Sequence, residues 1–375
     1  MLTGRSLPRR SIVILTAFCV LGAAVTASAL AAQKAPAPKV NPIFAYNKKD
    51  RTAYLYACAR REGEVTLYTS TSAMDPTIKP AFQKRFPGVK LNTYIATAQL
   101  VSKIRQEEAA GVHTFDVYND AMGNISRNAQ YFQPFWSPYM AQVRAGLASP
   151  YFLASNGYVY NGLYYNPNLI SAAEVPKSYQ DLLKPQFKGR IYMGIDTQAA
   201  IVTGLLGAIY GRDYYMKLAD QVRVVNTSGR GIADQIIAGT IPMGIQLSSS
   251  YYKRDYLNNG APLRLQVFNP MFGTFQASSI SKFTDKPCAS MLLVDWLNSR
   301  TSNGAQPIFA DLGNALPWKG SDILPFNVQG SQLPQKDWKI YYQTSRDIQK
   351  KLGFKNWTQL YAYWSKQYAQ HFING

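Results

Sequence analysis

Four short segments of this 375-residue chain carry polar side chains that could hold a small ligand. Three are hydroxyl- and amide-rich stretches that stand just before helical patterns: Thr69–Ser72, Asp196–Gln198 and Asn226–Arg230. A helix N-terminus offers unpaired backbone N–H groups and the positive end of the helix dipole, so three such loops around one cleft would form an oxyanion site. Ordinary helix capping by Ser72 or Ser228 is an equally good explanation.

Arg230 and the pair Tyr251–Tyr252 add a cation and two phenols to these loops. A guanidinium grips a carboxylate or phosphate with two parallel hydrogen bonds, and tyrosine rings can wall a ligand pocket. Three other adjacent tyrosine pairs occur in the chain, so the pair alone is a weak signal. We expect the following ligand contacts: Ser70, Thr71, Ser72, Asp120, Thr197, Gln198, Ser228, Gly229, Arg230, Tyr251 and Tyr252.

The sequence contains few residues or motifs that could catalyse a reaction. Asp116 and Asp120 would lie on one face of a strand and could form an acid–base pair, but a structural cap plus one cleft residue is the better interpretation. The chain has no Gly-x-Ser-x-Gly, His-Glu-x-x-His, P-loop or dinucleotide motif, and its only histidines are His113 and His371. We predict no catalytic residues and keep a secreted enzyme acting on a small anionic substrate as the alternative.

The N-terminus has the features of a secretory signal peptide. Arg5, Arg9 and Arg10 precede an apolar run, Ile12–Val25, which is followed by small residues. A basic start, an apolar run too short to span a membrane comfortably and an Ala-x-Ala site predict export and removal of residues 1–31. An uncleaved anchor is the alternative. We therefore expect the mature chain in the periplasm.

Residues 32–47 are rich in proline and poor in periodic apolar residues, which predicts a flexible tether. The formal net charge is +19, and removal of the three signal arginines leaves +16. This balance favours anionic ligands or surfaces, but the basic residues are scattered, so we expect no nucleic acid partner. Cys58 and Cys288 remain after processing, and a disulfide or two buried thiols would suit their predicted helices equally well.

Short β-type runs alternate with amphipathic helical patterns along the chain, which is typical of an α/β fold. In the first part we expect strands at Val65–Tyr68, Val89–Tyr94 and Phe115–Tyr118, with helices at Asp75–Phe86 and Gln99–Ala110. Asp75 should cap the first of these helices.

A long strand from Tyr158 to Tyr165 should cross into a second lobe. There we expect, in order, strand Arg190–Met193, helix Ala199–Tyr210, strand Val222–Val225, helix Gly231–Ala238 and strand Pro242–Leu247. Gly211 and Gly239 stand just past the two helices as expected C-caps. A last strand to Phe268 should lead to a return crossing at Asn269–Pro270.

The residues from Val175 to Ile191 form the most specific signature in the chain: Pro-Lys-Ser-Tyr, then Asp-Leu-Leu, then Lys-Gly before a strand. Other parts of the pattern are the opening strand–loop–helix order from Glu62 to Asp120 and the helix within Asp285–Leu297. Together they resemble the periplasmic solute-binding proteins of ABC importers, in the type II family that includes ferric-iron and phosphonate binders. The resemblance covers about Ala53 to Lys319.

The resemblance implies an α/β, two-lobed fold with a ligand cleft between the lobes. On this basis we divide the chain into a signal peptide (1–31), a tether (32–47), lobe 1 (48–156 and 270–319), lobe 2 (157–269) and a C-terminal helical cover (320–375). It also implies closure on one small ligand, which is delivered to an inner-membrane ABC permease. We expect a monomer without a cofactor.

Two ligand classes stay open within this family. Ferric binders have a tyrosine pair at about the place of Tyr251–Tyr252 as phenolate ligands, often with a histidine in the first loop and a carboxylate in the next. Asp120 could replace that carboxylate and Tyr160 could complete an all-tyrosine shell, but the histidine has no substitute. A small organic anion, such as a carboxylate, phosphonate or phosphate ester, fits the hydroxyl loops, Arg230 and the positive charge better. We therefore favour no metal site, with ferric iron as the alternative transported ligand.

Overall fold

The computed structural model describes residues 41–375 apart from 97–98, 329–334, 338 and 343–345. The predicted signal peptide and the first part of the predicted tether therefore lie outside the described residues. The last part of the tether differs from its prediction, because Asn41 caps a 3₁₀ turn at Pro42–Ala45 and Phe44 is buried. The Phe44 carbonyl also accepts a hydrogen bond from the Trp136 amide. Structure is therefore already present at Asn41, before the start near Lys48 that the sequence predicts.

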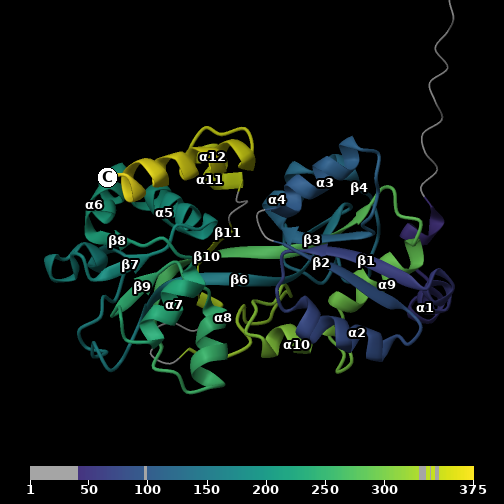
Figure 1. Ribbon diagram of the computed structural model, residues 1–375, viewed down its shortest axis with the longest axis horizontal. Coiled ribbons are helices and arrows are strands. Elements are labelled where there is room, and N and C mark those ends of the chain that lie inside the picture. The colour runs from purple at the N-terminus through teal and green to yellow at the C-terminus, as the bar shows by residue number, and fades with distance from the viewer. Residues whose placement is uncertain (1–40, 97–98, 329–334, 338, 343–345) are drawn as a thin grey trace, which may run out of the picture. The chain divides into compact units, whose positions relative to one another are not determined.

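One mixed sheet carries both halves of the fold, with the strand order β2-β1-β3-β10-β6-β9-β7-β8 (Figure 1). β1 is parallel to β2 and β3, and β7 is parallel to β8 and β9, while β10 runs antiparallel to β3 and β6. The strands are β1 Glu64–Thr69, β2 Lys90–Ile95, β3 Val117–Ala121, β4 Phe132–Gln133, β5 Ala148–Ser149, β6 Phe152–Tyr165, β7 Ile191–Met193, β8 Val222–Val224, β9 Met243–Ile245, β10 Arg264–Ser281 and β11 Ile340–Tyr342.

Helices cover the sheet on both sides of its central pair of strands, β6 and β10 (Figure 1). Their bounds are α1 Arg51–Glu62, α2 Lys79–Arg85, α3 Gln99–Ala109, α4 Met122–Arg127, α5 Thr197–Tyr210, α6 Arg212–Gln221, α7 Gly229–Ile237, α8 Ser249–Tyr251, α9 Pro287–Leu297, α10 Ala305–Asp311, α11 Arg346–Lys351 and α12 Trp357–Tyr368. Shorter π-helical turns at Met74–Ile78 and Tyr252–Leu257 adjoin α2 and α8. None of the helices in the described part of the chain is long and apolar enough to cross a membrane.

Most expected elements are present, and the differences have local causes. The strand expected to end at Phe268 continues through the Asn269–Pro270 step to Ser281, because its later residues pair with β6 and β3. Asp75 does not cap a helix: it lies inside the π-helical turn before α2 and accepts a hydrogen bond from Thr93 instead. Helix α6 was not expected from the sequence.

The buried side chains form two hydrophobic clusters that do not coincide with the two predicted lobes. The first surrounds β1–β3 and α9, but it also takes in residues beside α7 and α8, such as Ile232 and Leu247. The second lies where α5, α6 and α12 meet, with Leu205, Leu218 and Trp364 among its members. One face of the β9–β7–β8 half therefore shares a core with the β1–β3 half.

The last helix packs against α5, as Figure 1 shows. Gly204 makes this contact close, since a Cβ at that position would lie 2.3 Å from the ring of Trp364. Tyr368 donates a hydrogen bond to the Gly194 carbonyl at 2.6 Å, beside the start of α5. The C-terminal helices therefore cover the α5 side of the sheet.

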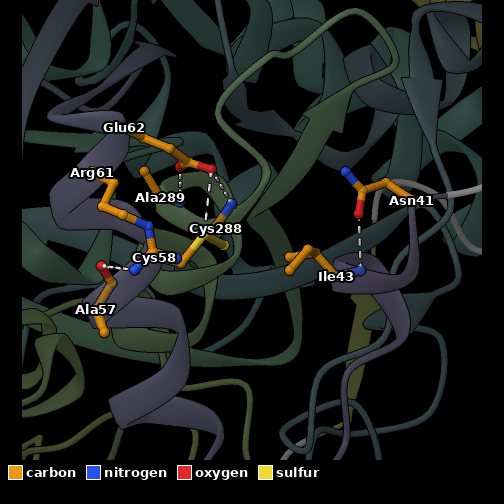
Figure 2. The surroundings of a disulfide bond; sticks show 8 residues. All are labelled: Asn41, Ile43, Ala57, Cys58, Arg61, Glu62, Cys288 and Ala289. Atoms are coloured by element: carbon orange, nitrogen blue, oxygen red, sulfur yellow. Dashed lines mark hydrogen bonds between the residues drawn. A yellow bond between two sulfur atoms is a disulfide. The ribbon is translucent and has the colours of Figure 1, made fainter.

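Cys58 of α1 and Cys288 of α9 form a disulfide, which decides the alternative that the sequence left open (Figure 2). Glu62 lies beside it and accepts the backbone N–H groups of Cys288 and Ala289, at 3.1 and 2.7 Å. The carboxylate thus satisfies two of the orphan donors at the start of α9. The first and ninth helices are joined both covalently and by this cap.

Candidate functional site

Asp196 is the hub of the polar network at the carboxyl ends of β7 and β9. Its side chain caps α5 by accepting the N–H groups of Gln198 and Ala199, both at 3.1 Å. It also accepts the Gly229 N–H at 2.6 Å and the Gln246 side-chain amide at 2.9 Å. Burial raises the pKa of Asp196, although these hydrogen bonds favour the charged form. Loops from three neighbouring elements are thereby held around one carboxylate.

This arrangement changes the predicted role of two helix N-termini. We expected the amides at the starts of α5 and α7 to face an anionic ligand, but those of Gln198 and Gly229 already bind Asp196. The exposed Ser228 caps α7 by accepting the Gly231 N–H. Thr197 is also exposed, and its hydroxyl accepts a hydrogen bond from Tyr361 of α12 at 3.3 Å. The Asp196 carboxylate therefore takes the place at these helix N-termini where we expected an anionic ligand.

Arg230 is held in place at the start of α7. It forms ion pairs with Asp234 and with Asp255. Its guanidinium carbon lies 5.4 Å from the ring centroid of Tyr251, and Arg254 approaches the same ring at the same distance. The two arginines and the two aspartates cancel in formal charge, so this corner of the site is neutral. Arg230 is therefore a positioned group rather than a lone cation.

Tyr251 lies close to several other phenols and carboxylates. Burial raises its pKa to about 12, and the neighbouring Asp196 and Tyr158 add to the rise. Burial also raises the pKa of Tyr160 well above its ordinary value, with Tyr251 and Asp196 as the next causes. Tyr160 and Tyr251 thus lie near Asp196, Tyr158 lies near both of these phenols, and all three tyrosines are protonated at neutral pH.

Tyr252 is placed differently from its neighbour. It is 1% exposed, belongs to the first hydrophobic cluster and lies against Tyr256 and Phe326. Adjacent residues of a helix point about 100° apart, so Tyr251 and Tyr252 face different surroundings. The tyrosines that join Tyr251 are Tyr158 and Tyr160 of β6 instead.

A second group of candidate residues lies where β1 and β3 end. Ser70 donates a hydrogen bond to Asp120 at 2.7 Å, and Asp120 also accepts from Tyr118 at 2.8 Å and Asn124 at 2.7 Å. Asp120 is 3% exposed, so it is mostly engaged by its own strand and helix. Thr71 is buried as well, while Ser72 is exposed in the following turn.

Tyr158 connects the two groups. Burial raises its pKa, and hydrogen bonds with Asn314 and Thr71 oppose that rise. The same phenol is one of the neighbours that raise the pKa of Tyr251. The structure therefore brings Thr71, Tyr158 and Tyr251 into one neighbourhood at the middle of β6, which we take as the candidate ligand site.

Besides Tyr160, which the sequence suggested only for an iron shell, four participants in this site were not among the predicted contacts: Asp196, Tyr158, Asn314 and Gln246. A capping Asp before a helix is visible in the sequence, but its reach to Gly229 and Gln246 depends on how β7 and β9 pair. Tyr158 stands two residues before Tyr160 on the same strand, so the period of two could have indicated it.

In the described part of the chain, the histidines and cysteines lie away from this site. His113 stacks on Phe283 and contacts Glu108, and His371 lies beside Tyr215. The grouping of Cys58, Glu62 and Cys288 could suggest metal ligands, but its two sulfur atoms form the disulfide. Any metal in the candidate site would have to bind oxygen atoms.

The family model described as bacterial extracellular solute-binding protein matches residues 114–344 of the chain. None of the curated proteins matches the chain in sequence.

Several solved structures share the fold at low sequence identity. The iron-bound HitA of Pseudomonas aeruginosa has 19% identity and a TM-score of 0.62, covering 80% of this chain and 99% of its own. AfuA of Actinobacillus pleuropneumoniae, with bound fructose-6-phosphate, has 17% identity and a TM-score of 0.64, covering 84% and 100%. The ferric iron-binding protein A of Mannheimia haemolytica, in an open conformation, has 16% identity and a TM-score of 0.60, covering 84% and 99%. The fold is the α/β, two-lobed fold of type II periplasmic binding proteins.

Proposed function

Because this chain belongs to the family of bacterial extracellular solute-binding proteins, we propose that it is the ligand-capturing component of an ABC importer. It binds one small ligand in the periplasm after removal of its signal peptide and delivers that ligand, as a monomer, to an inner-membrane permease. The observation that supports this role is the gathering of Tyr160 and Tyr251 near Asp196, with Tyr158 beside the two phenols. These side chains come from the crossing strand β6, from helix α8 and from the loop after β7.

A small organic anion is the ligand class that suits these groups best. With a pKa of about 12, Tyr251 is protonated at neutral pH and donates a hydrogen bond to an oxyanion. Arg230 keeps further N–H donors beyond those that bind Asp234 and Asp255, because a guanidinium has five. A carboxylate, phosphonate or phosphate ester would be held by these neutral and charged donors together.

Ferric iron is the second candidate, because phenolic oxygens are hard ligands that suit a hard cation. Its binding would require Tyr251 to lose a proton against a pKa of about 12. At pH 7 this costs about 7 kcal/mol, since each pKa unit corresponds to about 1.4 kcal/mol. Both ligand classes occur among the similar folds, with iron in HitA and fructose-6-phosphate in AfuA.

The way β6 and β10 link the two parts of the sheet supports capture by hinge closure. We propose that residues 48–156 and 270–319 form one lobe and residues 157–269 the other, with the hinge in these two strands. A ligand that contacts both lobes stabilises the closed form, because it shifts the equilibrium only by its preference for one state.

Thermal melting of the signal-free protein tests the proposal. The protein is unfolded, refolded with its disulfide intact to remove bound ligand, and melted with ferric citrate or with small carboxylates, phosphonates and phosphate esters. A ligand bound only by the native state raises the midpoint, and X-ray scattering should show compaction with the same ligand. The recovered ligand should be chemically unchanged, which separates a binding protein from an enzyme.

Two variants locate the site in the same assay. Tyr251→Phe and Arg230→Ala should each reduce the ligand-induced shift, while Tyr151→Phe, a change at an exposed tyrosine, should leave it unaltered. A shift with ferric citrate but not with citrate, together with a visible phenolate-to-iron absorption band, would favour iron over the organic anion. If no member of the panel shifts the midpoint, the proposed function fails.

A further inference from the structure

Gln246 stands directly after β9 in a backbone conformation that is rare for its residue type. Its φ is +71°, and it is the only non-glycine residue with a positive φ in the described ranges. The left-handed region is unfavourable for side chains other than Gly, Asn and Asp. Such conformations persist only where surrounding contacts hold them, and they are frequent at binding sites.

The contacts that hold Gln246 come from the Asp196 network. Its side chain is 2% exposed, and its Nε2 atom donates to Asp196 Oδ1 at 2.9 Å. Gly229, at the start of α7, approaches so closely that a Cβ there would lie 3.4 Å from the Gln246 carbonyl oxygen. The glutamine is therefore enclosed between the ends of β7 and β9 and the start of α7.

The hydrogen bonds fix which way the Gln246 amide points. Asp196 Oδ1 accepts the backbone N–H groups of Gln198 and Ala199, so it acts as an acceptor toward Gln246 as well. The amide must then turn its NH₂ group toward Asp196 and its oxygen away from it. That oxygen, Oε1, is buried and accepts no hydrogen bond from any residue in the described part of the chain. Buried acceptors are normally satisfied, so this one calls for a donor.

Gln198, whose backbone also binds Asp196, carries a second amide oxygen without a donor in the described residues. That oxygen, Oε1, is buried, and the Gln198 N–H binds the same oxygen of Asp196 as Gln246 does. Tyr160 and Tyr251 lie near enough to Asp196 for its charge to raise their pKa values. Gln246 thus shares its neighbour Asp196 with the phenols that we assign to the ligand.

A metal ion suits these acceptors less well than a hydrogen-bond donor does. Both oxygens of Asp196 already accept N–H groups, four in total, so the carboxylate would have to give up hydrogen bonds in order to bind a cation. Apart from the phenols, which are protonated at neutral pH, a metal ion would meet only neutral amide oxygens such as that of Gln246. A hydroxyl group needs no such rearrangement, because one amide oxygen satisfies it.

We propose that Gln246 determines specificity by accepting a hydrogen bond from a hydroxyl group of the ligand, so that the ligand is a hydroxylated organic anion rather than a bare ferric ion. The inference rests on the proposed function, since it concerns the same site. The hydroxyl faces the Gln246 and Gln198 amide oxygens, and the anionic group faces Tyr251 and Arg230. An anion without a hydroxyl leaves the amide oxygen buried and unpaired, which lowers its affinity.

Matched pairs of anions test this specificity by isothermal titration. The pairs are malate and succinate, citrate and tricarballylate, and glycerol 3-phosphate and propyl phosphate, each differing by hydroxyl groups. In the pair that binds, the hydroxylated member should bind roughly ten- to a hundredfold more tightly to the wild-type protein. Gln246→Met should bring the ratio close to one, while Gln186→Met, a change at an exposed glutamine, should leave it as in the wild type.

A second variant keeps the test valid if Gln246→Met does not fold. Gln246→Asn retains an amide and tolerates the positive φ, so it should fold and keep a ratio above one. Equal affinities within a pair in the wild type, or a ratio that survives in Gln246→Met, would overturn the role of Gln246. Binding of ferric iron alone would also overturn it while leaving the transport function standing. Absence of binding by every anion and by ferric iron would instead remove the proposed function itself.

Discussion

Removal of the Cys58–Cys288 disulfide should lower the stability of the protein by several kcal/mol. The two cysteines are 230 positions apart, so the bond closes a loop that includes most of the folded chain. The chain-entropy estimate for a loop of this length is about 5 kcal/mol at 25 °C, near the upper end of measured values. We expect the double variant Cys58→Ser/Cys288→Ser to lose between about 3 and 5 kcal/mol.

The corresponding change in melting temperature follows from the size of the folded part, Asn41–Gly375. At about 2 cal/mol/K per residue, the unfolding entropy is roughly 0.7 kcal/mol/K, so the loss corresponds to about 4–7 °C. The assay is a thermal melt of the wild type, of the double variant and of the wild type with a reductant. Because Glu62 still caps α9 in the variant, the loss of the bond is measured without loss of that cap.

Two results would refute this reasoning. The first is a native protein in which both thiols react with an alkylating agent before reduction, since Cys58 and Cys288 would then be unpaired. The second is a double variant that melts at the wild-type temperature although the bond was present, because the unfolded chain would then gain little freedom. Reduced wild type should melt with the double variant, which checks that the substitutions add no further damage.

Three further predictions concern groups away from the disulfide. Arg51→Leu should destabilise the protein by about 3–5 kcal/mol, because the buried carboxylate of Asp295 then loses the guanidinium nitrogen that lies 2.6 Å from its oxygen. In a denaturant titration, the double variant Arg51→Leu/Asp295→Leu should recover part of this loss. Ionisation of Tyr251 should lower the free energy of unfolding as the pH rises from 10 toward 12, because its raised pKa means that the native state holds the proton more tightly than the unfolded chain does. Tyr251→Phe should flatten the plot of stability against pH over this range. Gly204→Leu should displace Trp364 and expose α12 to proteolysis, whereas a change at an exposed position of that helix should not.

Strands and helices were largely predictable because their patterns are local. The period-two runs at β1 and β3 and the glycines after α5 and α7 identify elements without knowledge of their neighbours. The predicted tether was wrong after residue 40 because a single buried residue, Phe44, fixes it to the core. The length of β10 was also missed, since its continuation past Pro270 depends on pairing with distant strands.

The site was less predictable because its contacts are long-range. The sequence marks Asp196 as a helix cap, and it performs that role, but its bonds to Gly229 and Gln246 span 33 and 50 positions. Asp196 therefore binds backbone amides, such as that of Gly229, that the sequence led us to assign to a ligand. In the same way, only the packed structure separates Tyr251, near other phenols, from Tyr252 in the core.

The balanced charges around Arg230 have a consequence for transport. Arg230 and Arg254 are balanced by Asp234 and Asp255, so no unpaired charge at this corner would hold a ligand after the lobes separate. Affinity should then come mainly from hydrogen bonds, and apparent affinity scales with the population of the closed form. Opening on a permease would part Tyr158 of one proposed lobe from Thr71 and Asn314 of the other. A site of this kind can bind firmly when closed and still release its ligand when opened.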